Sequence, residues 1–124
     1  MSIAEKLRRS SPDQLFWRAS SRMQKEAMGP PYNPGSIRNA YARLEEITVE
    51  ELGASGNPDA IILRYSILAV HAGTALSMAE NNRDSETAGE FRAIFEELRG
   101  AIGGLGKPLE SMRARMEQRQ QSQA

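Results

Sequence analysis

The longest apolar stretch of the chain lies between Asn57 and Asn82 and reads NPDAIILRYSILAVHAGTALSMAENN. Asn57 is a favourable N-cap, Pro58 fits the first helical position, and Asp59 lies where the helix dipole stabilises an anion. The apolar positions that follow predict a helix of about 25 residues that needs cover on nearly every side. Neighbouring helices, or copies of this helix from other subunits, must provide that cover.

A second helix is expected immediately after this one, near residues 85–102. Its apolar residues recur every three or four positions, which is the period of an amphipathic helix. They are Ala88, Phe91, Ile94, Phe95, Leu98 and Ile102. Because only a short turn separates two long helices, residues 58–82 and 85–102 are predicted to form a central antiparallel hairpin.

Two further helices are predicted before the hairpin. Ser11 opens a helix that runs to about Met28, and the segment GPPYNPG at 29–35 follows as a stiff, extended connector rich in proline. Asn33 or Ser36 caps the next helix. The buried stripes expected on these helices are Leu15, Phe16, Ala19, Met23 and Ala27 on the first, and Ile37, Ala40, Tyr41, Leu44 and Ile47 on the second.

The remaining segments predict shorter elements. A short helix is expected at residues 3–9, a separate capped turn at 48–52, and a last helix that starts at Pro108. Its apolar face consists of Leu109, Met112 and Met116. The fold class is therefore all-α, a small bundle of four to five helices in a single domain at 1–117, with a polar C-terminal tail at 118–124.

Composition removes several kinds of chemistry. The chain contains no cysteine and one histidine, His71, so it has no disulfide framework, no thiol nucleophile and no Cys-ligated metal site. No cofactor or metal is expected. Glutamates that are adjacent in the sequence, such as Glu45 and Glu46, diverge by about 100° on a helix and cannot act as a catalytic pair. The expected class is a protein without enzymatic activity.

Residues 61–79 are about as long as a membrane span, but Arg64 and His71 interrupt them, so we expect a core helix and no membrane contact. The first residues lack the apolar core of a secretory signal. We therefore expect a cytoplasmic location or one within a virion or other particle.

The formal charge is zero, yet it is unevenly distributed. Residues 1–43 contain eight basic and three acidic side chains, residues 44–97 three and eleven, and residues 98–124 five and two. Basic ends flanking an acidic middle are consistent with head-to-tail pairing of subunits, with nucleic-acid contact, or with ordinary solvated helix faces. The residues expected to contact phosphate in the second case are Arg18, Arg22, Lys25, Arg113 and Arg115.

Three further candidate contacts follow from residue spacing. Small and apolar side chains on the central helix predict an oligomer interface, with packing inside one chain as the alternative. This interface comprises Ile62, Ala69, Ala72, Gly73 and Leu76. Trp17 and Tyr32 are candidate anchors for a protein partner, with ordinary packing as the alternative for Trp17. Arg64 and His71 are seven residues apart and lie on the same side of the helix, so they form a candidate anion contact. The alternative is that Arg64 pairs with a glutamate of a neighbouring helix and that His71 is a partly buried polar group with its hydrogen bonds satisfied.

The sequence therefore favours a self-associating adaptor, structural or inhibitory protein that binds other copies of itself and another protein, as in a phage-like assembly. The first alternative is a nucleic-acid-associated oligomer, a packaging or regulatory subunit with basic N-terminal helices and a basic tail. The second alternative is an oligomer that binds a nucleotide near Arg64 and His71.

Overall fold

The computed structural model describes residues 12–54, 58–103 and 106–123. The described part is helical almost throughout and contains no strand, which confirms the predicted all-α class. Its elements are α2 (Pro12–Met28), α3 (Pro34–Ala54), α4 (Pro58–Asn81), α5 (Ser85–Arg99), the 3-10 helix η1 (Gly100–Gly103) and α6 (Gly106–Gln123). The helix predicted at 3–9 and the N-cap predicted at Asn57 lie outside the described residues.

Local side-chain chemistry sets two of the helix starts. The Asn33 side-chain oxygen accepts a hydrogen bond from the Ser36 backbone N–H at 3.1 Å, so Asn33 and not Ser36 caps α3. Asp84 caps α5 in the same way by accepting from the Thr87 N–H at 3.1 Å. The turn between α4 and α5 also holds Arg83 at a φ of 56°, in the left-handed region.

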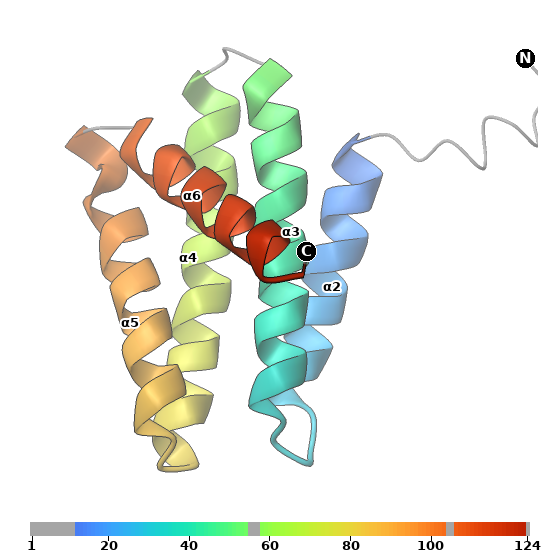
Figure 1. The fold of residues 1–124 in the computed structure, drawn as a ribbon, viewed down its shortest axis with the longest axis vertical. Helices are drawn as coiled ribbons and strands as arrows, with labels where there is room; N and C mark the ends of the chain where they lie inside the picture. The colour runs from blue at the N-terminus through green and yellow to red at the C-terminus, as the bar shows by residue number, and fades with distance from the viewer. Residues whose placement is uncertain (1–11, 55–57, 104–105, 124) are drawn as a thin grey trace, which may run out of the picture.

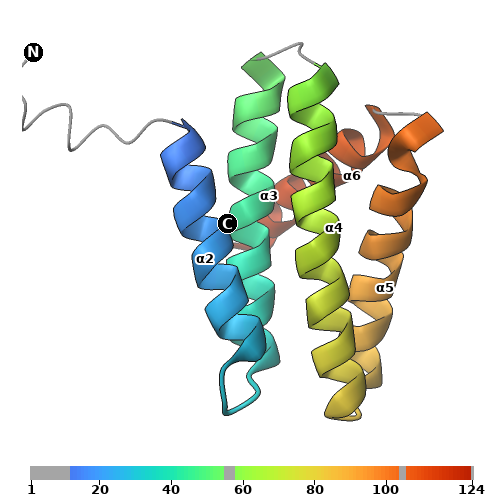
Figure 2. The ribbon, with the colours of Figure 1, turned by 180° about the vertical axis from the view of Figure 1, so that it is seen from behind.

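The helices form two antiparallel pairs, α2 with α3 and α4 with α5, which pack against each other through α2, α3 and α4. Figure 1 shows α6 crossing the front of the bundle from the end of α5 towards α3. In Figure 2 the molecule is seen from behind, and α6 lies on the far side of α3 and α4. The predicted central hairpin is thus confirmed as α4 and α5, with η1 taking the last turn of the second predicted helix.

The core consists largely of the predicted stripes. All five residues of the α3 stripe are buried, as are four of the five on α2. Leu15 is the exception at 37% exposure. Phe91 of α5 packs edge-on against Tyr41 of α3 with ring centroids 5.4 Å apart, which joins the two hairpins. Met112 brings α6 into the same core.

Some predicted boundaries were wrong. Pro34 and Gly35 belong to α3, so the connector covers 29–33, because proline is well tolerated in a first helical turn. The separate turn predicted at 48–52 is a continuous part of α3. The last helix begins at Gly106, before Pro108, and it continues to Gln123, so most of the predicted polar tail is helical.

One helix in the described part, Asp59–Asn81 within α4, is long and apolar enough to cross a membrane on length and composition alone. A core helix of a soluble bundle passes the same test. About a third of its most apolar window, 33%, is buried inside the bundle. The rest is half-buried or exposed, and the exposed positions include Ile62, Leu63 and Val70.

Candidate interaction surfaces

The outward face of α4 carries three large apolar side chains in contact with solvent. Ile62 is 50% exposed, Leu63 is 54% exposed and Val70 is 66% exposed. Figure 2 shows α4 at the front of the bundle with no other described element crossing it. Scattered apolar side chains are common on protein surfaces, but these three lie within about two turns of one helix, with the exposed Ser66 between Ile62 and Val70.

A shallow groove of about 420 Å³ runs beside this face, between α4 and the end of α5. Its lining is mostly apolar and comprises Ile62, Tyr65, Ser66, Ala69, Phe95, Leu98, Arg99 and Ala101. We call the outward face and the groove together the α4 surface, defined by Ile62, Leu63, Ala69, Val70 and Phe95.

The residues predicted for an oligomer interface divide between the inside and the outside of the bundle. Ile62 is exposed, and Ala69 and Leu76 are half-buried. Ala72 is fully buried among the helices of the same chain. Gly73 faces α5, because a side-chain carbon added to it would lie 3.4 Å from the Phe95 ring, an ordinary contact distance. Small residues on this helix thus pack within the chain as well as facing outward.

Arg64 and His71 point inward, towards neighbouring helices. Arg64 is 4% exposed, its Nη2 lies 2.9 Å from Glu51 Oε1, and its guanidinium lies 4.0 Å above the Phe16 ring. The His71 Nε2 is 2.7 Å from the Ser20 hydroxyl, and burial lowers the pKa of His71 below 6.5. Protein groups therefore occupy the places where the predicted anion contact would need a ligand, and both residues tie α4 to its neighbours.

The two predicted aromatic anchors have different surroundings. Trp17 is 50% exposed and packs edge-on against Phe16. The Tyr32 hydroxyl donates a hydrogen bond to Asp84 Oδ2 at 2.8 Å, and burial is the main reason that the pKa of Tyr32 is raised. Tyr32 thus fastens the connector to the turn between α4 and α5. Trp17 keeps half of its surface available for a partner.

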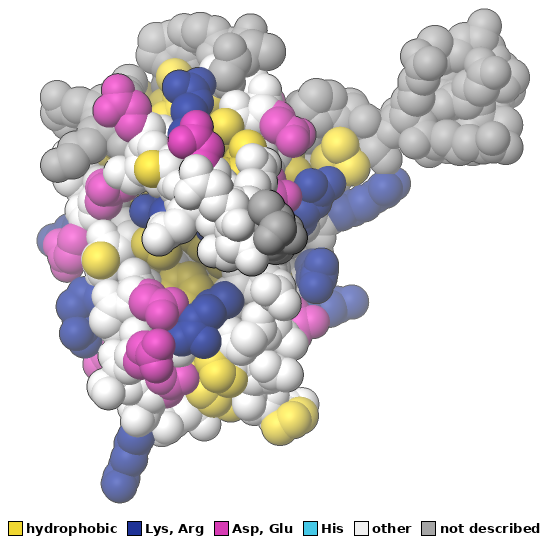
Figure 3. All heavy atoms as spheres, viewed as in Figure 1, with side chains coloured by type: hydrophobic (Ala, Val, Ile, Leu, Met, Phe, Trp, Pro, Cys, Tyr) yellow, Lys and Arg dark blue, Asp and Glu magenta, His cyan; other side chains and the backbone are white. Residues whose placement is uncertain are grey.

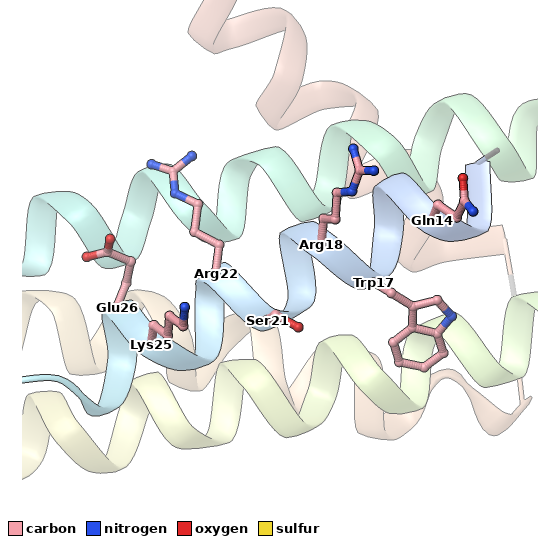
Figure 4. A pocket seen from close by; sticks show the side chains of 7 residues that line it. All are labelled: Gln14, Trp17, Arg18, Ser21, Arg22, Lys25 and Glu26. Carbon is pink, nitrogen blue, oxygen red and sulfur yellow. The ribbon is translucent and has the colours of Figure 1, made fainter. Parts of the chain in front are cut away.

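Basic side chains gather on the exposed face of α2. Figure 4 shows Arg18, Arg22 and Lys25 along this face, together with Trp17. All three basic residues are exposed, and none forms an ion pair with another described residue. In the space-filling view of Figure 3, Lys and Arg side chains line the edge of the molecule where α2 lies.

An ion-pair cluster at the crossing of α3 and α6 was not expected from the sequence. Glu45 is 1% exposed and accepts a hydrogen bond from Arg115 Nε at 3.1 Å, while Arg119 Nη2 lies 3.5 Å away at an ion-pair distance without a hydrogen bond. Burial raises the pKa of Glu45, and the two arginines oppose that rise.

Glu45 follows Tyr41 by four residues and precedes Thr48 by three, so its helical register already placed it beside the buried stripe of α3. Among the predicted phosphate contacts, Arg115 is therefore paired with α3, whereas Arg113 is exposed.

The described residues contain no group of three or more His, Asp or Glu side chains arranged to hold a metal ion. Comparison of the chain with protein-family models, with curated proteins and with solved structures finds no match, so the surfaces above are interpreted from their chemistry alone.

Proposed function

We propose that this protein is a non-enzymatic helical module that associates with copies of itself through the α4 surface, and so acts as an adaptor or structural subunit. The observation that carries the proposal is the exposure of Ile62, Leu63 and Val70 on a face without charge. Arg64 is the one charged residue between Asp59 and Glu80, and it is turned into the bundle. A second copy covers Ile62, Leu63 and Val70 without burying a charge, whereas Arg99, which lines the groove and is exposed, has to stay at the rim of the interface.

A second copy suits the surface because a twofold interface uses the same patch on both partners. Val70 and Leu63 form a ridge next to the groove between α4 and α5, so each copy can lay its ridge along the groove of the other. The small side chains of Ser66 and Ala69 at the edge of the groove permit close approach of the backbones.

The ridge alone does not explain a stable dimer. Completing the burial of a half-exposed Ile, Leu or Val contributes about 1 kcal/mol, so six such side chains from two copies contribute about 6 kcal/mol. Association costs at least about 4 kcal/mol in lost translational and rotational freedom. The interface must therefore include the groove, with the half-buried Phe95, and we expect dissociation constants in the micromolar range.

Sedimentation equilibrium between micromolar and submillimolar concentrations tests the proposal. Val70→Glu places a charge on the ridge at a position that is exposed in the single chain, so we expect a folded monomer. Ala93→Glu, at an exposed position of α5, is the matched control and should associate as the wild type does. A wild type that stays monomeric, or a Val70→Glu variant that associates normally, would contradict the proposal.

The nucleic-acid alternative remains a separate proposal, supported by the unpaired basic face of α2 with Arg18, Arg22 and Lys25. Its test is duplex binding that weakens steeply as salt rises, since phosphate contacts release counterions. The nucleotide-binding alternative has less support, because Arg64 and His71 contact protein groups.

A further inference from the structure

A polar hollow of about 320 Å³ lies where the last turns of α6 cross α3 beside α2. Its polar lining comes from three helices that are far apart in the sequence. It consists of Arg22 on α2, of Asn39, Arg43 and Glu46 on α3, and of Arg119 and Gln120 on α6.

Positive charge in this hollow exceeds the negative charge that could neutralise it. The lining holds three arginines and one carboxylate, that of Glu46, and the buried Glu45 carboxylate next to it is shared by Arg115 and Arg119. The Arg43–Glu46 pair is a surface contact at 3.4 Å with both side chains at least a third exposed, which makes it weak. Arg22 has no ion-pair partner among the described residues.

Arg119 adds donors that lack acceptors. Its Nε and Nη2 atoms are shielded from solvent, and neither finds a hydrogen-bond acceptor. The carboxylate next to it, Glu45, is already hydrogen-bonded by Arg115. Because Nη2 lies 3.5 Å from Glu45 and Nε is closed to solvent, an oxyanion in the hollow contacts Arg119 through the exposed part of its side chain, which is 33% exposed.

We propose that this hollow binds a phosphate group. Arginines from three helices line the hollow and can each donate to a phosphate oxygen, and Asn39 and Gln120 add neutral amide donors. The phosphate displaces Glu46 from its weak contact with Arg43. The proposal goes beyond self-association, since the hollow and the α4 surface share no residue. The same chemistry fits a small phosphorylated ligand or one phosphate of a nucleic-acid backbone.

The neighbouring residues on α2 provide a matched control. Arg18 precedes Arg22 by one helical turn and is equally exposed, yet it does not line the hollow. Non-specific attraction of an anion to basic α2 would therefore depend on both arginines alike. A discrete site depends on Arg22 and on Arg43, which is on another helix.

Titration with inorganic pyrophosphate at constant ionic strength, followed by amide chemical shifts of the full chain, tests the site. We expect saturable shifts confined to the segments around Arg22, Arg43 and Arg119. Arg22→Gln and Arg43→Gln should each weaken binding by about tenfold, and Arg18→Gln by less than about twofold. Far-ultraviolet circular dichroism verifies that each variant is folded. Shifts that do not saturate, or equal losses in Arg18→Gln and Arg22→Gln, would overturn the proposal.

A short DNA duplex in the same titration separates the two sources of phosphate. Duplex binding that pyrophosphate competes away, and that Arg22→Gln impairs more than Arg18→Gln, supports the site with a nucleic-acid ligand. Pyrophosphate binding without duplex binding supports it with a small ligand. Duplex binding without any pyrophosphate binding overturns it. The monomeric Val70→Glu variant should still bind pyrophosphate, so failure of self-association leaves this test intact.

Discussion

The ion pair between Glu45 and Arg115 joins α3 to α6 across 70 residues of sequence, and its removal is the most informative stability experiment. We consider Arg115→Met, which preserves much of the side-chain volume and removes the charge. The Glu45 carboxylate is 1% exposed, so it cannot recover water when its partner is lost. The Arg115 side chain is 31% exposed and lies at the edge of the cluster.

The magnitude follows from these exposures. Removing one member of a fully buried ion pair costs about 3–5 kcal/mol, because the remaining charge is left buried. Water near Arg115 and the Arg119 guanidinium 3.5 Å from Glu45 offset part of that cost. We therefore expect Arg115→Met to lower the free energy of unfolding by about 2 kcal/mol at pH 7.5, which corresponds to about 8 °C in the melting temperature.

The loss should depend on pH in a defined direction. Burial raises the pKa of Glu45 above its usual value of 4.5, and Arg115 opposes that rise, so the pKa is higher still in Arg115→Met. The folded variant then holds the Glu45 proton to higher pH than the unfolded chain does. Its stability relative to wild type is best below pH 4.5 and falls as pH rises through the raised pKa.

Urea denaturation of wild type and Arg115→Met at pH 4.5 and pH 7.5, followed by circular dichroism, measures both effects. Glu45→Gln is the control and should cost less than about 1 kcal/mol, because the partly exposed arginines can be rehydrated. In the double variant, the second substitution should add little. A loss below about 0.5 kcal/mol at pH 7.5, or the same loss at both pH values, would refute the reasoning about the buried carboxylate.

Three other substitutions have clear expectations. Phe91→Ala removes a ring that is 2% exposed from the contact between the hairpins, and urea denaturation should show a loss of about 3–5 kcal/mol in the free energy of unfolding. A loss below about 1 kcal/mol would indicate that the ring is not packed between the hairpins. Gly73→Ala should raise the melting temperature by a few degrees, since alanine favours a helix by up to about 1 kcal/mol and the new methyl lies at an ordinary contact distance of 3.4 Å from the Phe95 ring. A lower melting temperature would show that the Phe95 ring cannot move to accommodate the methyl group. The pKa of His71 is lowered by burial, so the unfolded chain takes up the proton first and the wild type should lose stability as pH falls below 6.5. His71→Gln also changes the contact with Ser20, but it should lack this part of the pH dependence of stability. An unchanged pH dependence in the variant would exclude His71 as its source.

Local interactions made much of the fold predictable. The apolar repeat through Ile37 and Leu44 marked the buried side of α3, and both side chains are fully buried. Asn33 was correctly among the candidate caps because its side chain reaches a backbone N–H only three residues away. Two boundaries were missed because a first helical turn tolerates proline. Pro34 was assigned to the connector although α3 starts there, and Pro108 was taken as the first residue of a helix that starts at Gly106.

The candidate sites were less predictable, because they combine residues from different helices. Arg64 and Glu51 are 13 residues apart and meet because α3 and α4 fold back on each other, which the sequence suggested only as a pairing with some glutamate. The hollow formed by Arg22, Arg43 and Arg119 depends on where α6 crosses the bundle. No local pattern in α6 specifies that crossing.

The helical segments and the apolar side of each helix follow from local sequence, since these properties depend on residues within one or two turns of each other. Contacts between helices bury Glu45 beneath α6, pair Arg64 and His71 with residues of other helices, and leave Ile62, Leu63 and Val70 exposed. The physical reason is that helical periodicity specifies which side chains share a face, whereas the packing angles between helices determine which faces are covered.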